Sequence, residues 1–260
     1  MEKEQSNKVT RIEINPKYES LRPFVERLPQ VFDEQGEFVY GGRNLIKSFQ
    51  APGGLALVVK RYHVPAMPNR LIYSLGIRAP KGRRAFDYPA RLLPKGINTP
   101  EAVALIEERN AVGLLGYSYF VSVRCDYGHT LYEMGNARAE EYEVVAEAVG
   151  RYAAEIHEKD VLHRDFTPGN ILWQRREDGG FDFCLVDINR MFFGPVSPKR
   201  GVRNITHLWG PKRFTQLLVR AYAEARSIDV EKAERLALET RRKFWTRYMK
   251  KQQVPFKIEL

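Results

Sequence analysis

The sequence predicts an α+β chain of two lobes, a small antiparallel sheet with one helix in residues 1–123 and a mainly helical lobe in residues 124–260. Three observations lead to this prediction. Short apolar runs separated by glycine and proline turns fill the first part. Apolar residues at helical spacing begin near residue 139 and return towards the C-terminus. A polar loop at 163–170 precedes two short runs that are typical of a β-hairpin.

The first lobe contains apolar runs that we expect to form its sheet. Residues 37–40 and 46–49 predict two strands around a glycine turn, and residues 55–60 predict a third strand, which ends in Lys60. After the turn at 96–100, residues 102–106 and 117–123 predict the remaining strands. We expect the hinge to the larger lobe near residues 124–126, with the base of a bound nucleotide against it.

The most informative stretch is His163-Arg164-Asp165-Phe166-Thr167-Pro168-Gly169-Asn170, followed by a strand that ends at Asp187. A carboxylate such as Asp165 can accept a hydroxyl proton, and Asn170 and Asp187 offer the oxygen ligands that hold Mg²⁺ on a triphosphate. His163 and Arg164 are expected to have structural roles. Proline, glycine and asparagine also suit a simple turn.

The flanking residues favour catalysis over a simple turn. Residues 139–159 predict a helix before the loop, and residues 171–173 and 181–186 predict a hairpin closed by the turn 175–180. Helix, loop, hairpin and metal-binding aspartate follow one another in the order of a protein-kinase-like fold. The chain is therefore predicted to be an ATP-dependent phosphotransferase that uses Mg²⁺.

Lys60 and the glycine turn are the candidate phosphate-binding residues of the first lobe. Backbone amides of Gly41, Gly42, Arg43 and Asn44 could approach phosphate oxygens closely, because glycine has no side chain in the way. The turn lacks the GxGxxG spacing, so an ordinary hairpin turn is the alternative. A lysine that ends an edge strand is the alternative for Lys60, but its position after two such strands favours the phosphate-pairing role.

The catalytic lysine of this chemistry needs a carboxylate partner. Between Lys60 and Glu101 the only acidic residue is Asp87, which is therefore the candidate. Pro89 follows two residues later and suits the first turn of a helix, so Asp87 could instead cap a helix start.

Composition excludes several other classes of protein. No run approaches the roughly 18 apolar residues of a membrane span, and the first residues do not form a signal peptide, so we expect a cytoplasmic protein. Cys125 and Cys184 form no spaced metal motif, so we expect free thiols and no zinc.

The positive charge is concentrated at one end of the chain. Residues 199–260 contain 16 Lys and Arg against 6 Asp and Glu, which equals the whole net charge of +10. Much of this charge could simply be the solvated face of helices. The surplus still favours an anionic partner such as a phosphorylated glycolipid or a membrane surface, and nucleic acid is not expected because no binding module accompanies it.

Several strings together resemble one known family, the lipopolysaccharide kinases of Gram-negative bacteria that act on Kdo or core heptose. The similarity covers roughly residues 36–225. It implies ATP-dependent phosphorylation of a sugar hydroxyl in the inner core of a lipid A-linked saccharide, at the cytoplasmic face of the inner membrane. It also implies Asp165 as base, Asn170 and Asp187 as Mg²⁺ ligands and Lys60 on the phosphates. The strings are Val58-Val59-Lys60-Arg61-Tyr62, Arg84-Ala85-Phe86, Gly96-Ile97-Asn98-Thr99-Pro100, the loop from His163 to Leu172, and Leu185-Val186-Asp187.

Departures from the protein-kinase pattern leave alternatives open. Ile188 and Asn189 follow Asp187 in place of Phe-Gly, and Thr167 stands where many protein kinases have a lysine. No Ala-Pro-Glu string follows to anchor a peptide-binding segment, which favours a small or lipid-borne acceptor. A protein kinase, a kinase for a soluble metabolite and a pseudokinase-like binding module are the alternatives.

Overall fold

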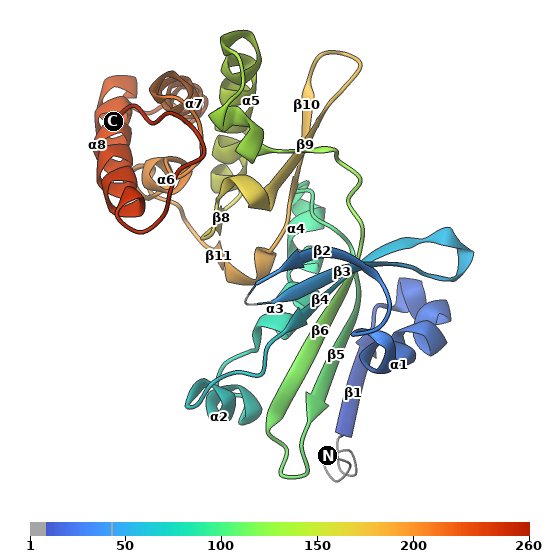
Figure 1. Cartoon of the computed structure of the whole chain (residues 1–260). Helices are drawn as coiled ribbons and strands as arrows, with labels where there is room; N and C mark the ends of the chain where they lie inside the picture. The colour runs from blue at the N-terminus through green and yellow to red at the C-terminus, as the bar shows by residue number, and fades with distance from the viewer. Residues whose placement is uncertain (1–8, 43) are drawn as a thin grey trace. The chain divides into compact units, whose positions relative to one another are not determined.

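The computed structural model describes residues 9–42 and 44–260. The chain forms two compact units (Figure 1). The first contains the residues up to Pro94 together with Thr99–Cys125, and the second contains Lys95–Asn98 and Asp126–Leu260.

The first unit is built on one antiparallel sheet of six strands in the order β1-β5-β6-β4-β3-β2. The strands predicted at 37–40, 46–49, 55–60, 102–106 and 117–123 are all confirmed, and β5 and β6 are longer than predicted. β1 was not predicted. The strands are β1 (Val9–Ile14), β2 (Glu37–Gly41), β3 (Leu45–Gln50), β4 (Ala56–Tyr62), β5 (Ala102–Arg109) and β6 (Leu115–Val123).

Helices pack on both faces of this sheet, so the prediction of a single helix in this lobe is wrong. On one face α1 (Arg22–Val31) and Phe32 bury apolar side chains against Leu57 and Val59 of β4, and this contact forms the core of the unit. On the other face α3 (Lys81–Asp87) lies so close that a Cβ added at Gly82 would be 3.1 Å from the Leu105 side chain. The shorter helices are η1 (Pro16–Leu21), η2 (Pro52–Gly54), α2 (Asn69–Ser74), α4 (Pro89–Leu92) and η3 (Leu93–Lys95).

Four long or medium helices form most of the second unit. The helix predicted at 139–159 is confirmed as α5 (Ala139–Glu158), and its apolar residues Val145 and Val149 are buried. α5 packs on α7 through Gly150, where an added Cβ would lie 2.3 Å from the carbonyl oxygen of Leu218. The other helices are η4 (Leu131–Gly135), α6 (Pro198–Ile205), α7 (Lys212–Ala225) and α8 (Val230–Met249).

Two small sheets complete the second unit and carry the loops of interest. The predicted hairpin is confirmed as β9 and β10, and β7 pairs with its outer edge. β8 pairs with β11 antiparallel, so that His163 lies opposite Met191. The strands are β7 (His129–Thr130), β8 (Val161–His163), β9 (Ile171–Arg175), β10 (Phe181–Leu185) and β11 (Met191–Phe193), with η5 (Pro168–Asn170) and η6 (Ile188–Arg190) beside them.

Two predictions from composition can be compared with these residues. Cys125 and Cys184 are both outside any disulfide, as predicted, and Cys184 is buried whereas Cys125 is only partly buried. Of the described helices, none combines the length and the apolar character needed to cross a bilayer.

Candidate active site

The predicted catalytic loop connects β8 to β9 in the second unit. Backbone hydrogen bonds fold it tightly, since the amide of Thr167 donates to the carbonyl of Asp165 at 2.8 Å and the amide of Asn170 donates to that of Thr167 at 3.0 Å. Pro168 begins the 3₁₀ turn η5, where its fixed φ is favourable. These local hydrogen bonds therefore hold Asp165 and Asn170 in one compact turn.

His163 links this loop to the strand before Asp187. Its Nε2 lies 3.0 Å from the carbonyl oxygen of Val186, and its Nδ1 accepts a hydrogen bond from the backbone amide of Asp165 at 3.1 Å. The ring is fully buried, and this burial lowers the pKa of His163. A neutral imidazole with one donor and one acceptor nitrogen satisfies both bonds. The predicted structural role of His163 is therefore confirmed by its geometry.

Asn170 makes a second link between the same segments. Its side-chain Nδ2 donates to the carbonyl of Asp165 at 2.9 Å, and its backbone carbonyl accepts from the amide of Val186 at 3.0 Å. The nitrogen is thus engaged within the loop, while Oδ1 is the atom that could bind a cation. The structure therefore brings Asp165, Asn170 and the residue before Asp187 together.

Asp187 begins η6 in an unusual conformation. Its φ of 53° and ψ of 41° lie in the left-handed region, which aspartate tolerates better than most residues. Strained backbone of this kind is often found at functional sites. The side-chain Nδ2 of the buried Asn189 donates to the Asp187 carboxylate. The residue that replaces the glycine of Asp-Phe-Gly thus holds the predicted metal ligand.

Arg190 is a site residue that the sequence reasoning missed. Its guanidinium Nη1 donates to the two carboxylate oxygens of Asp165 at 2.8 Å and 3.0 Å. The ion pair is partly exposed, with 55% of the Arg190 side chain and 30% of the Asp165 side chain accessible. A signal was present in the sequence, because Arg190 follows Asp187 by three residues and must lie near it.

Lys60 lies on β4 of the first unit, on the sheet face opposite the core residues Leu57 and Val59. Its Nζ is 5.3 Å from the ring centroid of Tyr62, two residues further along the same face. The position on a central strand, between β3 and β6, argues against the edge-strand alternative. Its role towards phosphate stays a prediction.

Asp87 is the last residue of α3, and its carboxylate lies 3.1 Å from the guanidinium of Arg83. Gly82 and Ala85 face the sheet, and helical geometry turns residue 87 away from that face. Pro89 does stand in the first turn of α4, but Tyr88 occupies the cap position, so the alternative of Asp87 as a helix cap is wrong. The pairing of Asp87 with Lys60 stays a prediction.

The glycine turn lies between β2 and β3 of the first unit, as predicted. Gly41 ends β2 and pairs with Leu45, and the amide of Gly42 donates to the carbonyl of Asn44 at 3.2 Å. Arg43 lies outside the described residues. No contact within this turn tests its predicted role towards phosphate.

The donor set of the second unit fits Mg²⁺. An amide oxygen of Asn170 and the carboxylate of Asp187 are hard oxygen ligands, and Mg²⁺ is commonly held by only one or two side chains together with substrate phosphates and water. Within the described residues there is no cluster of three His, Cys, Asp or Glu side chains that could hold a metal alone.

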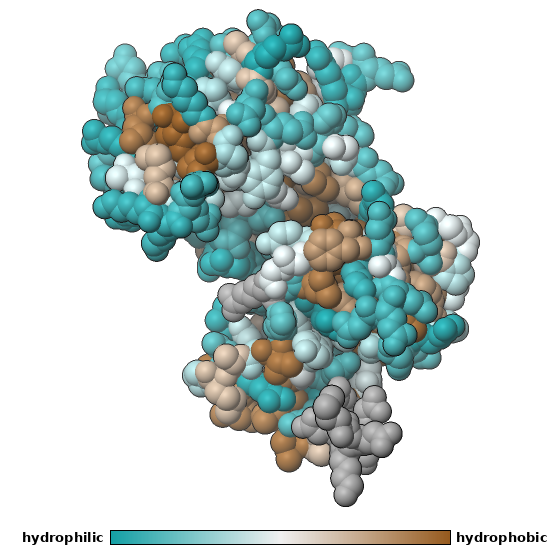
Figure 2. Space-filling model, in the orientation of Figure 1, coloured by the Kyte–Doolittle hydropathy of each residue, from teal (hydrophilic) through white to brown (hydrophobic). Residues whose placement is uncertain are grey.

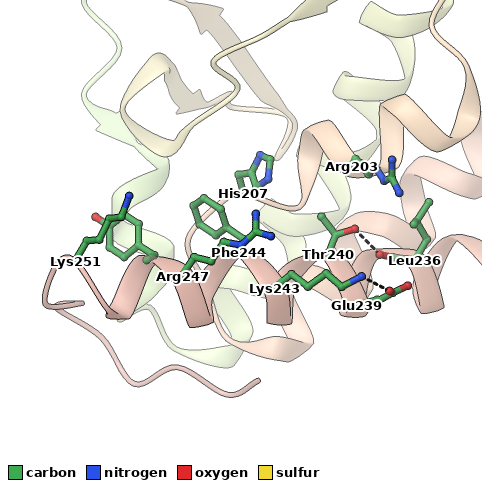
Figure 3. A pocket seen from close by; sticks show the side chains of 10 residues that line it. Arg203, His207, Leu236, Glu239, Thr240, Lys243, Phe244, Arg247 and Lys251 are labelled. Carbon is green, nitrogen blue, oxygen red and sulfur yellow. Dashed lines mark hydrogen bonds and ion pairs between the residues drawn. The ribbon is translucent and has the colours of Figure 1, made fainter.

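Part of the basic C-terminal end lines a cavity of about 420 Å³ at α6 and α8 (Figure 3). Among the residues that line this cavity, the rings of His207 and Phe244 pack with their centroids 4.6 Å apart. Burial lowers the pKa of His207. Lys243 pairs with Glu239 at 2.5 Å, which leaves a basic surplus among the lining residues. They are Arg203, His207, Leu236, Glu239, Thr240, Lys243, Phe244, Arg247, Tyr248 and Lys251.

Comparison with known proteins identifies the family and the fold. The family model of the lipopolysaccharide kinases (Kdo/WaaP) matches residues 31–208. A structure of WaaP in complex with acyl carrier protein is 18% identical, with a TM-score of 0.58 over 92% of this chain and 99% of that chain. The amicoumacin kinase hAmiN in complex with AMP-PNP, Ca²⁺ and Ami is 11% identical, with a TM-score of 0.51 over 92% of this chain and 96% of that chain. A search of curated protein sequences gives no significant match. The predicted kinase-like fold is confirmed.

Proposed function

This chain belongs to the lipopolysaccharide kinase (Kdo/WaaP) family of phosphotransferases, and we propose that it transfers the γ-phosphoryl group of ATP to a hydroxyl of Kdo or heptose in the lipopolysaccharide inner core. One observation above all supports this. His163 and Asn170 join Asp165 to the strand before Asp187 through hydrogen bonds of 2.9–3.1 Å. A candidate base and a candidate metal ligand from different stretches of chain are thus held in one network.

The proposed mechanism assigns positioning and proton transfer to side chains of this chain. Asp165 orients the acceptor hydroxyl and accepts its proton as the phosphoryl group is transferred. Asn170 and Asp187 would hold Mg²⁺, which when bound neutralises charge on the phosphate oxygens. Lys60 would pair with phosphate oxygens, and Asp87 is the proposed partner that orients Lys60. Backbone amides of Gly41, Gly42 and Asn44 would approach the phosphates.

Arg190 fits this mechanism as a residue that holds the base. Its two contacts fix the direction of the Asp165 carboxylate before an acceptor arrives. A carboxylate fixed in place costs less to orient in the transition state. We therefore propose that Arg190 positions Asp165.

The acceptor is proposed to be lipid-borne and met at the cytoplasmic face of the inner membrane. No Ala-Pro-Glu string follows Asp187, so a peptide-binding segment of the protein-kinase type is not expected. The basic surplus of residues 199–260 favours an anionic glycolipid or membrane surface.

A protein partner is also proposed, because the matched WaaP structure contains an acyl carrier protein. The basic cavity of Figure 3 offers charged and aromatic side chains for such a contact. Titration of this chain with purified acyl carrier protein tests the idea, and the absence of saturable binding would reject it.

The proposed reaction is tested with labelled ATP, Mg²⁺ and lipid A precursors that bear either Kdo or Kdo with heptose, alongside a generic protein substrate. We expect label in one glycolipid only. Asp187→Ala should lower turnover by about 100-fold or more, because a metal ligand is lost. Asp178→Ala, an exposed aspartate in the β9–β10 turn, is the matched control and should keep full turnover. Label in protein, or full turnover in Asp187→Ala, would reject the proposal.

A further inference from the structure

A cluster of apolar side chains projects into solvent around α2 in the first unit. Leu75 and Ile77 are 71% and 73% exposed, and Val112 in the turn between β5 and β6 is 78% exposed. Figure 2 shows hydrophobic residues gathered over α2 and this turn. We call this cluster the α2 surface, and its members are Val64, Met67, Leu71, Leu75, Ile77 and Val112.

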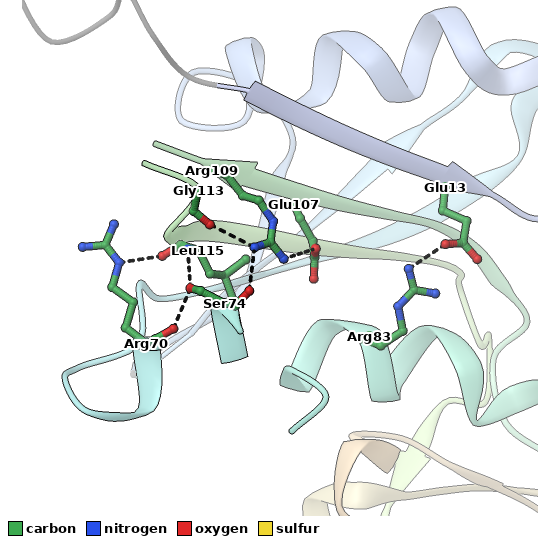
Figure 4. Close-up of polar contacts among 8 residues, drawn as sticks. All are labelled: Glu13, Arg70, Ser74, Arg83, Glu107, Arg109, Gly113 and Leu115. Atoms are coloured by element: carbon green, nitrogen blue, oxygen red, sulfur yellow. Dashed lines mark hydrogen bonds and ion pairs between the residues drawn. The ribbon is translucent and has the colours of Figure 1, made fainter. Parts of the chain in front are cut away.

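Hydrogen bonds hold α2 to the β5–β6 turn (Figure 4). Arg70 donates from Nε to the carbonyl of Leu115 at 2.8 Å, and the amide of Leu115 donates to the hydroxyl of Ser74 at 2.9 Å. Arg109 donates to the carbonyl of Gly113 at 3.0 Å, which braces the turn itself. The apolar side chains are therefore mounted on a braced structure and need little ordering when they are buried by a partner.

The segment that carries α2 is basic. Residues 61–86 contain six Lys and Arg and no Asp or Glu. Arg78 is exposed directly beside Ile77. The two carboxylates drawn in Figure 4 are paired with arginines, Glu107 with Arg109 at 3.2 Å and Glu13 with Arg83 at 2.6 Å.

We propose that the α2 surface inserts its apolar side chains into the interface of an anionic lipid bilayer. Apolar residues flanked by basic ones gain from burial at the acyl boundary and from attraction to anionic headgroups. This deepens the proposed function, because a lipid-borne acceptor lies at such a surface. It also differs from the sequence prediction, which placed the anionic contact in residues 199–260.

The chemistry of the surface favours lipid over a protein partner. Its exposed apolar members are aliphatic, whereas the centres of protein interfaces are enriched in aromatic residues. They project from the end of a helix and from a β-turn, which suits insertion between headgroups. The membrane is therefore the occupant that these observations support.

Co-sedimentation with vesicles tests the proposal without ATP or acceptor, so its outcome is independent of the proposed kinase reaction. We expect binding to phosphatidylcholine vesicles that contain phosphatidylglycerol and much weaker binding to pure phosphatidylcholine. Leu75→Glu with Ile77→Glu should weaken binding by about tenfold or more. Arg78→Gln should weaken binding by about fivefold and make it less sensitive to salt. Thermal unfolding checks that each variant is folded, which the high exposure of these side chains favours.

Two controls decide where the contact lies. Val144→Glu places the same charge on an exposed apolar residue of α5 in the second unit and should change binding by less than about twofold. Lys250→Gln with Lys251→Gln removes two cations of the basic end. The proposal is overturned if the folded Leu75→Glu, Ile77→Glu variant binds normally, or if the Lys250 and Lys251 variant alone loses binding. It is also overturned if wild-type protein binds acyl carrier protein through Leu75 and Ile77 but binds no vesicle.

Discussion

Replacing His163 with phenylalanine isolates the hydrogen bonds that join the catalytic loop to the strand before Asp187. A phenyl ring fills a similar volume, so the cavity left behind is small. It can neither donate to the carbonyl of Val186 nor accept from the amide of Asp165, the two bonds that the imidazole makes. The variant therefore tests whether these bonds position Asp165.

The expected magnitude follows from burial. His163 is fully buried, so both backbone groups lose a partner that water cannot easily replace. A buried polar group without a partner costs about 1–3 kcal/mol, so for the two groups we expect the free energy of unfolding to fall by about 2–6 kcal/mol. The loop can relieve part of this cost by moving, and a displacement of about 1 Å at a catalytic group lowers the rate by about 100-fold. We therefore expect kcat to fall by about 100-fold.

Urea unfolding measures the stability, and turnover of labelled ATP onto glycolipid measures the rate, well below the unfolding temperature. Leu218→Ala is the control, because it creates a cavity at a buried position of α7 and leaves the sequence of the loop unchanged. It should lower the free energy of unfolding by about 2–5 kcal/mol. It should keep near-normal kcat. Normal kcat in His163→Phe, or an equal loss in Leu218→Ala, would refute the reasoning.

Three further predictions concern Arg190, His157 and Asp87. Arg190→Gln removes both contacts to Asp165 and should lower kcat by about tenfold, with partial recovery in Arg190→Lys, whereas an unchanged kcat would show that the ion pair is incidental. Burial lowers the pKa of His157 from 6.5 to about 4, so below pH 6.5 the unfolded chain takes up a proton that the folded chain does not. The free energy of unfolding should therefore fall by about 2 kcal/mol between pH 7.5 and pH 5. Urea unfolding of the wild type and of His157→Gln at these two pH values measures this. If Asp87 orients Lys60, Asp87→Asn should raise KM for ATP about as much as Lys60→Met does, and a normal KM would leave Asp87 only its bond to Arg83.

Local patterns in the sequence predicted much of this fold. The hairpin at β9 and β10, helix α5 and strand β4 each depend on residues close together in the chain, so their periodicity and turn residues were sufficient. The catalytic loop was predictable for the same reason, because Asp165, Thr167 and Asn170 are bonded to one another within six residues.

Elements that depend on distant partners were missed. β1 is stabilised by pairing with β5, and Val9 lies opposite Arg109. The residues next to Val9 in the sequence do not indicate this distant partner. α1 contains Pro29 in its interior, which weakens the local signal for a helix, and its stability comes from the apolar face buried on the sheet. The α2 surface was missed because exposure of an apolar residue cannot be read from its neighbours in sequence.

The stretch from Asp187 to Arg190 was the least predictable part of the candidate site and explains its main departure from the protein-kinase pattern. Phe-Gly is replaced by Ile188 and Asn189, yet the side-chain Nδ2 of the buried Asn189 donates to the Asp187 carboxylate. Arg190, one residue later, holds the Asp165 carboxylate through two contacts. The pairing of β8 with β11 makes this reach possible, because it places the segment after η6 beside the start of the catalytic loop. Asn189 of the altered triplet and the arginine that follows it therefore support the two candidate carboxylates, which argues that the departure is a different way of building the site and that the loss of Phe-Gly does not by itself remove activity.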